Sequence, residues 1–116
     1  MKSLTLNVMV VDDDLRMCQL IEELIGKKGI RLSAYTEPQK AMKAMSEVQP
    51  DIVITDLMMP EIDGMAILRK AKEKNPDTTV IVITGYGTVG SAVEAMKTGA
   101  YDYIEKPFEP EEFQMV

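Results

Sequence analysis

The chain has 116 residues, a length typical of one domain that buries a hydrophobic core without disulfides or structural metals. Its apolar content of 46% and charged content of 28% are those of an ordinary globular protein, and the sequence indicates neither a membrane span nor a signal peptide. A net charge of −6 argues against direct contact with nucleic acid. The absence of histidine excludes Ser-His-Asp and Cys-His catalysis, histidine-ligated zinc and a phosphohistidine carrier.

The single cysteine, Cys18, cannot form an internal disulfide, which favours a reducing, cytoplasmic compartment. It falls within an apolar helical pattern, so we expect a buried structural thiol and not a reactive one.

The first half of the chain alternates between a strand pattern and a helix pattern. Apolar, β-branched residues predict strands over 6–11 and 30–35, and between them an amphipathic helix that ends at Gly29. Thr36, Glu37, Pro38 and Gln39 then form a capping-box pattern with proline in the first turn, which predicts the start of a second helix.

The middle of the chain repeats this alternation. A strand is predicted over 51–55 and a helix from about Gly64 to Asn75, where Pro76 stops it. The next strand is predicted over 79–84.

The last part begins with a helix that starts near Thr88 and ends before Gly99. A strand over 100–105 follows, and a fifth helix begins near Pro110. Two turns are marginal for a helix, so the short fifth helix predicts a chain cut from a longer one.

Strands that alternate with helices predict βαβ units, and therefore a parallel sheet with helices on both faces. Because such crossovers are right-handed, few topologies remain. We expect an α/β fold: a doubly wound five-stranded parallel sheet in the flavodoxin-like order 2-1-3-4-5. Residues 1–116 are predicted to form one domain.

Chemically useful residues follow the strands at their carboxyl ends, where ligands bind in open α/β sheets. Asp12 and Asp13 follow the first strand, Asp56 the third, Thr84 ends the fourth and Lys106 follows the fifth. Taken singly, each of these residues has an ordinary structural explanation. Their joint placement at one edge favours a functional site.

Three clustered carboxylates raise one another's pKa unless a cation neutralises them, and oxygen ligands favour Mg²⁺ or Mn²⁺. Such a site suits phosphoryl transfer to the carboxylate opposite the Asp12–Asp13 pair, giving an acyl phosphate whose oxygens Thr84 and Lys106 bind. The third aspartate of the run, Asp14, is predicted to be the N-cap of the first helix.

Four segments resemble the receiver (response regulator) domain of two-component signalling systems. They are VVDDD at 10–14, TDLMMPEIDG at 55–64, VITGYGT at 82–88 and YDYIEKPF at 101–108. The resemblance extends over residues 6–113. The amino-acid sequences of these segments are most similar to those in receivers of nitrogen-regulatory, enhancer-binding-type regulators.

The resemblance implies that Asp56 accepts a phosphoryl group from a histidine kinase or a histidine phosphotransfer protein. It implies that Mg²⁺ is held by Asp12, Asp13, Asp56 and the backbone carbonyl of Met58, with Asp13 the more direct ligand of the acidic pair.

It also implies roles for residues around the site. Thr84 and Tyr103 are expected to form the switch, and Lys106 to bind the phosphoryl group. The peptide between Lys106 and Pro107 is expected to be cis, and Gly64 to turn the chain into the third helix.

The expected output is a change in the surface formed by the fourth helix, the fifth strand and the fifth helix. That surface is a candidate for homodimer formation or for contact with an output domain of the parent chain. The chain is expected to be a cytoplasmic phosphoacceptor and not an enzyme in the usual sense, with no membrane contact, although it contributes to its own phosphorylation and dephosphorylation.

Three alternatives use the same fold. A phosphorylation-independent binding module would not need the full five-residue set, and a Mg²⁺-dependent small-molecule phosphatase or phosphotransferase would need a cap or extra loops for its substrate. A nucleotide or flavin binder would need a glycine-rich phosphate loop after the first strand, where acidic residues stand instead.

Overall fold

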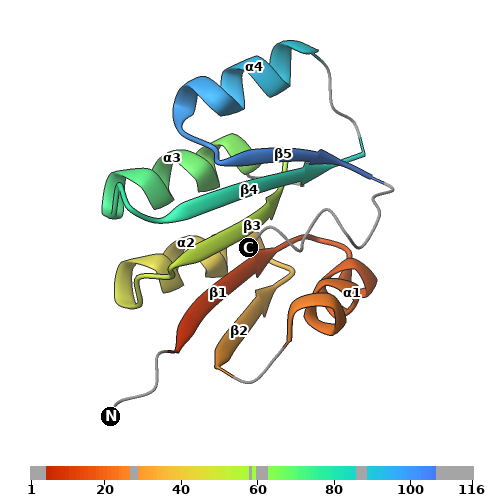
Figure 1. Cartoon of the computed structure of the whole chain (residues 1–116), viewed down its shortest axis with the longest axis vertical. Helices are drawn as coiled ribbons and strands as arrows, with labels where there is room; N and C mark the ends of the chain where they lie inside the picture. The colour runs from red at the N-terminus through yellow and green to blue at the C-terminus, as the bar shows by residue number, and fades with distance from the viewer. Residues whose placement is uncertain (1–4, 27–28, 58, 60–62, 86–88, 107–116) are drawn as a thin grey trace.

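The computed structural model describes residues 5–26, 29–57, 59, 63–85 and 89–106, and this part of the chain contains one five-stranded parallel sheet (Figure 1). Its order is β2-β1-β3-β4-β5, which confirms the predicted flavodoxin-like topology. The strands are β1 (Leu6–Val11), β2 (Ile30–Tyr35), β3 (Ile52–Asp56), β4 (Thr79–Thr84) and β5 (Asp102–Glu105).

Helices cover both faces of the sheet. Among the described residues they are α1 (Leu15–Ile25), α2 (Pro38–Glu47), α3 (Gly64–Lys74) and α4 (Val89–Thr98). Residues of α1 pack in one buried cluster, and residues of α2, α3 and α4 pack in another. The two clusters lie on opposite faces of the sheet because each draws alternate residues from the same strands.

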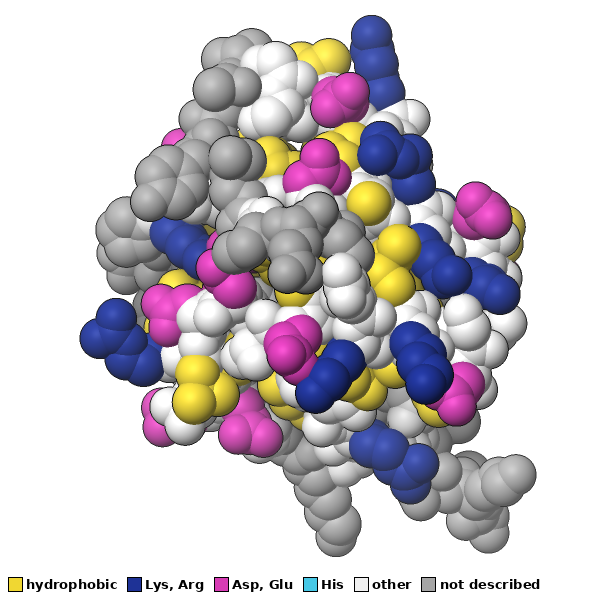
Figure 2. Space-filling view, turned by 180° about the vertical axis from the view of Figure 1, so that it is seen from behind, with side chains coloured by type: hydrophobic (Ala, Val, Ile, Leu, Met, Phe, Trp, Pro, Cys, Tyr) yellow, Lys and Arg dark blue, Asp and Glu magenta, His cyan; other side chains and the backbone are white. Residues whose placement is uncertain are grey.

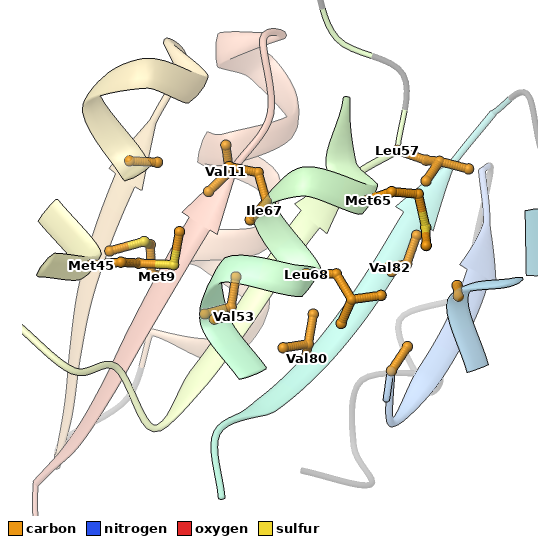
Figure 3. Packing of buried hydrophobic residues seen from close by; sticks show 14 residues of the cluster. Met9, Val11, Met45, Val53, Leu57, Met65, Ile67, Leu68, Val80 and Val82 are labelled. Carbon is orange, nitrogen blue, oxygen red and sulfur yellow. The ribbon is translucent and has the colours of Figure 1, made fainter. Parts of the chain in front are cut away.

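The central strand β1 shows how this division arises. Val8 and Val10 belong to the cluster that contains α1, whereas Met9 and Val11 belong to the other. Figure 3 shows the second cluster, in which α3 places Ile67 and Leu68 over the sheet and Met45 of α2 lies beside Met9. The side chains that this figure labels are Met9, Val11, Met45, Val53, Leu57, Met65, Ile67, Leu68, Val80 and Val82.

The predicted end of the first helix was wrong. Helix α1 ends at Ile25, and the backbone N–H of Gly26 donates to the carbonyl of Glu22. Gly29 adopts a φ of 91°, and its carbonyl accepts a hydrogen bond from the N–H of Leu6 on β1. This glycine therefore begins the pairing of β2 with β1 and does not cap the helix, a use of left-handed backbone that suits glycine.

The predicted capping box at Thr36 was also wrong. Pro38 is the first residue of α2, which makes Glu37 the N-cap, and the Glu37 side chain makes no capping hydrogen bond. Its carboxylate lies 2.7 Å from the ammonium of Lys40 instead. Proline favours the first helical position because its fixed φ suits a helix start, so it places the helix start one residue later than the pattern suggested.

Two strand boundaries differ from the prediction. Strand β3 begins at Ile52, after Asp51, whose backbone and carboxylate bond to the backbone of Asn7. The strand includes Asp56 because Asp56 pairs with Ile83 of β4. Strand β5 begins at Asp102 instead of residue 100. The predicted fifth helix lies outside the described residues.

Charged side chains of both signs are interspersed over the face that Figure 2 shows, with small apolar areas between them. Within the described part of the chain, no helix has the length and apolar content needed to cross a membrane.

Candidate functional site

Two neighbouring strands bring the acidic residues together. Strand β1 pairs with β3 in parallel, with Val11 opposite Thr55, so that Asp12 and Asp56 follow at the same level. One carboxylate oxygen each from Asp12, Asp13 and Asp56 lies within 4.8 Å of the other two. Asp12 and Asp56 are buried, with 2% and 6% of their surface exposed, whereas Asp13 is exposed. The group is therefore open to solvent on the side of Asp13.

Lys106, which follows the edge strand β5, bridges two of these carboxylates. Its Nζ lies 2.9 Å from Oδ2 of Asp12 and 3.2 Å from Oδ2 of Asp56. The backbone N–H of Lys106 donates to the carbonyl of Thr84, which holds the end of β5 against β4. The Lys106 side chain is only 20% exposed, so this ion pair is shielded from solvent.

Burial and charge act in opposite directions on these groups. Burial raises the pKa of Asp12, although the hydrogen bond from the Asp14 backbone and the nearby Lys106 ammonium partly offset this effect. For Lys106, burial alone lowers the pKa, but the bonds and charges of Asp12 and Asp56 outweigh it, and the pKa is raised. The ammonium of Lys106 and the carboxylates of Asp12 and Asp56 thus stabilise one another in a buried environment that disfavours each charge alone.

Asp14 and Cys18 support the acidic pair without joining it. Oδ1 of Asp14 accepts a hydrogen bond from the N–H of Arg16 at 2.9 Å, which confirms Asp14 as the N-cap of α1. Its own N–H donates to Oδ1 of Asp12 at 2.9 Å. The buried Cys18 thiol donates to the carbonyl of Asp12 at 3.4 Å, and burial raises its pKa to about 11, as expected for a structural thiol.

The two predicted switch residues lie on the adjacent strands β4 and β5. Thr84 is fully buried at the end of β4, where it pairs with Glu105 of β5. Tyr103 is half-buried on β5 opposite Val82, and its hydroxyl forms a 2.9 Å hydrogen bond with the hydroxyl of Ser91 on α4.

The structure thus places Asp12, Asp13, Asp56 and Lys106 in one cluster, with Thr84 at the end of the strand beside Asp56. Met58 and Pro107 lie outside the described residues, and with them the predicted carbonyl ligand and the predicted cis peptide.

Sequence reasoning missed two features near the site. One is the Ser91–Tyr103 hydrogen bond, which joins a helix to a strand and leaves no periodic signal. The other is the close packing of Gly64 against β3: its N–H donates to the carbonyl of Leu57 at 2.7 Å, and a Cβ there would meet the backbone of Asp56. An Asp-Gly pair at the start of a helix pattern was the available signal for it.

Comparison with known proteins decides the family. The response regulator receiver domain matches residues 8–116. The chain belongs to this family.

Two curated relatives match most of this receiver domain. The DNA-binding transcriptional regulator NtrC of Proteus hauseri is 37% identical over 106 residues, which cover 91% of this chain and 22% of the relative. The C4-dicarboxylate transport transcriptional regulatory protein DctD of Pseudomonas aeruginosa is 39% identical over 101 residues, covering 87% and 22%. The chain therefore spans about a fifth of the length of these transcriptional regulators.

Solved structures agree with this assignment. The receiver domain is similar to the solution structure of the beryllofluoride-activated NtrC4 receiver domain dimer, with a TM-score of 0.86 and 36% identity over 94% of this chain and 90% of that one. The chain thus has the receiver domain fold. It is the receiver domain of a two-component response regulator, which is a signalling protein.

Proposed function

We propose that Asp56 is the phosphoacceptor of this receiver domain and that phosphoryl transfer to it requires Mg²⁺. The observation that carries the proposal is the cluster of three carboxylates, one buried at the end of β3, with the Lys106 ammonium beside it. A buried carboxylate with one oxygen facing an ammonium and two further carboxylates nearby suits both metal binding and attack on phosphorus.

The donor set fits a hard divalent cation. Within the described residues, the cluster offers oxygens from Asp12, Asp13 and Asp56, and oxygen ligands favour Mg²⁺ or Mn²⁺ over zinc or copper. The proposal adds the backbone carbonyl of Met58 as a further ligand. When bound, the cation supplies neutralisation of the negative charge that gathers around the transferred phosphoryl group.

The protein's own groups carry the transfer. An oxygen of the ionised Asp56 carboxylate attacks the phosphorus of a phosphohistidine on the partner, the phosphorus–nitrogen bond breaks, and the imidazole leaves with that electron pair. The product on Asp56 is an acyl phosphate with new acceptor oxygens. Lys106 pairs with one of these oxygens and the Thr84 hydroxyl donates to another.

The response proceeds along β4 and β5. Movement of Thr84 toward the phosphoryl group leaves a space, and the Tyr103 ring then moves into it. This movement changes the surface formed by α4, β5 and the fifth helix. The change is a shift between two pre-existing arrangements.

Membership of the receiver domain family supports the proposed partners. The donor is a histidine kinase or a histidine phosphotransfer protein, and an output domain of the parent protein receives the change. Val93 and Met96 on α4 are each 47% exposed, and apolar exposure on this face together with the NtrC4 receiver dimer supports homodimer formation there. The location and domain organisation complete the proposal. The buried free thiol of Cys18 supports a cytoplasmic location. Residues 1–116 act as one domain.

Intact-mass spectrometry after incubation with Mg²⁺ and acetyl phosphate tests the acceptor. The parent chain is expected to gain the mass of one phosphoryl group, and Asp56→Asn to gain none, because an amide cannot form the acyl phosphate. Asp77→Asn, in the turn before β4 at the opposite edge of the sheet, makes the same chemical change and should be phosphorylated like the parent. Equal phosphorylation of Asp56→Asn would show that another residue is the acceptor.

A further inference from the structure

The side chains of Ser91 and Tyr103 join α4 to β5 through a hydrogen bond between two hydroxyl groups. Their oxygens are 2.9 Å apart, either one can donate, and both side chains are half-buried. A bond between two partly shielded hydroxyls holds its partners in place more strongly than one at an exposed surface.

The position of Ser91 on its helix directs its side chain inward. Ser91 and Ala95 are four residues apart on α4 and therefore share one face of the helix. Ala95 is fully buried in the cluster between the helices and the sheet, whereas Val93 and Met96 are exposed on the other side. Ser91 thus faces β5 because the packing of α4 turns it that way.

Tyr103 lies between this helix and the strand that ends at the switch threonine. It pairs with Val82 of β4 and packs against the same buried cluster. Val82 and Thr84 are two residues apart on β4 and point to the same face of the sheet. Tyr103 is therefore next to the face on which Thr84 lies, with the Ser91 hydroxyl on its other side.

We propose that Ser91 is a positioning residue of the switch: its hydroxyl holds Tyr103 in the observed place and so sets how readily the ring leaves when Asp56 is phosphorylated. The inference rests on the proposed function, in which Tyr103 moves in response to Asp56. In the proposed movement toward Thr84 the ring carries its hydroxyl away from Ser91, so the bond stabilises the observed arrangement.

The expected change in the Tyr103 equilibrium follows from the free energy that one hydrogen bond contributes. A net contribution typical of a protein hydrogen bond changes an equilibrium between two arrangements roughly two- to tenfold. Coupling between sites is reciprocal, so a change in the Tyr103 equilibrium appears as a change in affinity for a phosphoryl mimic at Asp56, and the two are equal while the observed arrangement predominates. Loss of the bond should therefore tighten binding of the mimic.

The test is calorimetric titration of beryllofluoride into the full chain in the presence of Mg²⁺. Ser91→Ala and Tyr103→Phe are each expected to raise the affinity roughly two- to tenfold, and the double variant no further than either. Ser91→Thr retains the hydroxyl and should stay near the parent. Ser46→Ala removes an exposed serine hydroxyl from α2 and should also bind like the parent.

The outcomes separate this inference from the proposed function. Unchanged or weaker binding in Ser91→Ala, or additive effects in the double variant, would overturn the role of Ser91 while leaving Asp56 as the acceptor. If the parent chain does not bind beryllofluoride, or if Asp56→Asn binds it equally well, both the role of Ser91 and the proposed function of Asp56 are overturned.

Discussion

Adjacent residues of the acidic pair have different surroundings. Asp12 is 2% exposed, and its carboxylate accepts hydrogen bonds from the Asp14 backbone and from Lys106. Asp13 is exposed. Asp12 therefore contributes to the fold as well as to the site, whereas the Asp13 carboxylate has the freedom to turn toward an ion.

Replacement of Asp13 separates metal binding from folding. Asp13→Ala is expected to weaken Mg²⁺ binding by about tenfold or more, because the cluster loses a ligand oxygen, and to leave the unfolding temperature nearly unchanged. Magnesium titration by calorimetry, paired with thermal unfolding, measures both.

Asp14→Ala is the matched control for that change. It should remove the cap of α1, at a cost of about 0.5–2 kcal/mol in the free energy of unfolding, with Mg²⁺ affinity retained. Unchanged Mg²⁺ affinity in Asp13→Ala would exclude Asp13 from the metal site.

The placement of the site residues could be predicted from the sequence because each one ends or follows a strand pattern. A strand that ends in aspartate predicts where that aspartate lies once the strand order is known, so Asp12 and Asp56 could be placed together. The bridge made by Lys106 could be placed only at the same edge, since the path of a long side chain depends on packing. The hydroxyl pair of Ser91 and Tyr103 had no signal, because it depends on how α4 rotates against β5.

At the scale of elements, the start of α3 is packed against the strand that bears Asp56. The Asp63 side chain caps the helix by accepting from the N–H of Ala66 at 3.0 Å, and Gly64 follows with its N–H on the carbonyl of Leu57. A Cβ at residue 64 would collide with the Asp56 carbonyl oxygen and come within 2.7 Å of the Leu57 Cα. These are backbone atoms, so no side-chain rotation can relieve the contact.

Gly64→Ala is therefore expected to lower the free energy of unfolding by about 1–3 kcal/mol and to slow phosphorylation by acetyl phosphate, because α3 must move away from β3. Chemical denaturation and intact mass over time measure the two effects.

Gly85→Ala is the matched control for residue 64. Among the described residues its Cβ would meet the Lys106 side chain alone, at an ordinary distance of 3.8 Å, so the variant's stability should stay within about 1 kcal/mol of the parent. Parent-like stability in Gly64→Ala would mean that the close approach is not a constraint.

Element boundaries were less readable than element types. The order of strands and helices followed from periodicity, which depends on which face of each segment is buried. The ends of α1 and α2 depended on single interactions: Gly29 pairs with β1, and Pro38 sets the start of α2. Such interactions compete with local capping patterns, and a pattern alone cannot show which prevails.

Across the whole molecule, one side chain ties the edge strand to the centre of the sheet. Lys106 follows β5 at one edge and reaches Asp12 beyond β1 and Asp56 on β3. Because its pKa is raised in the folded protein, its contribution to stability is complete below its ordinary value of 10.5 and is lost as pH rises through the raised value.

Lys106→Met is expected to lower the free energy of unfolding at pH 7 by roughly 1–3 kcal/mol, since two shielded carboxylates lose their counter-ion. The difference from the parent should shrink above pH 10.5, where the parent lysine also loses its charge. Urea denaturation from pH 7 to about pH 11.5 measures both curves.

Lys43→Met, at an exposed position of α2, controls for the loss of a lysine charge and should follow the parent at every pH. If the free energies of unfolding of Lys106→Met and the parent differ by the same amount at every pH up to about 11.5, the bridge does not stabilise the fold.

The span of this bridge also bears on synthesis at the ribosome. Lys106 and Asp12 are 94 positions apart, and Lys106 and Asp56 are 50 apart. A nascent chain carries both carboxylates long before it carries the ammonium that neutralises them, and domains complete their folding only when their last elements emerge. Under the proposed function, a phosphoryl donor would meet a complete site only on a chain whose translation has passed Lys106, so an unfinished polypeptide would not yet accept the phosphoryl group.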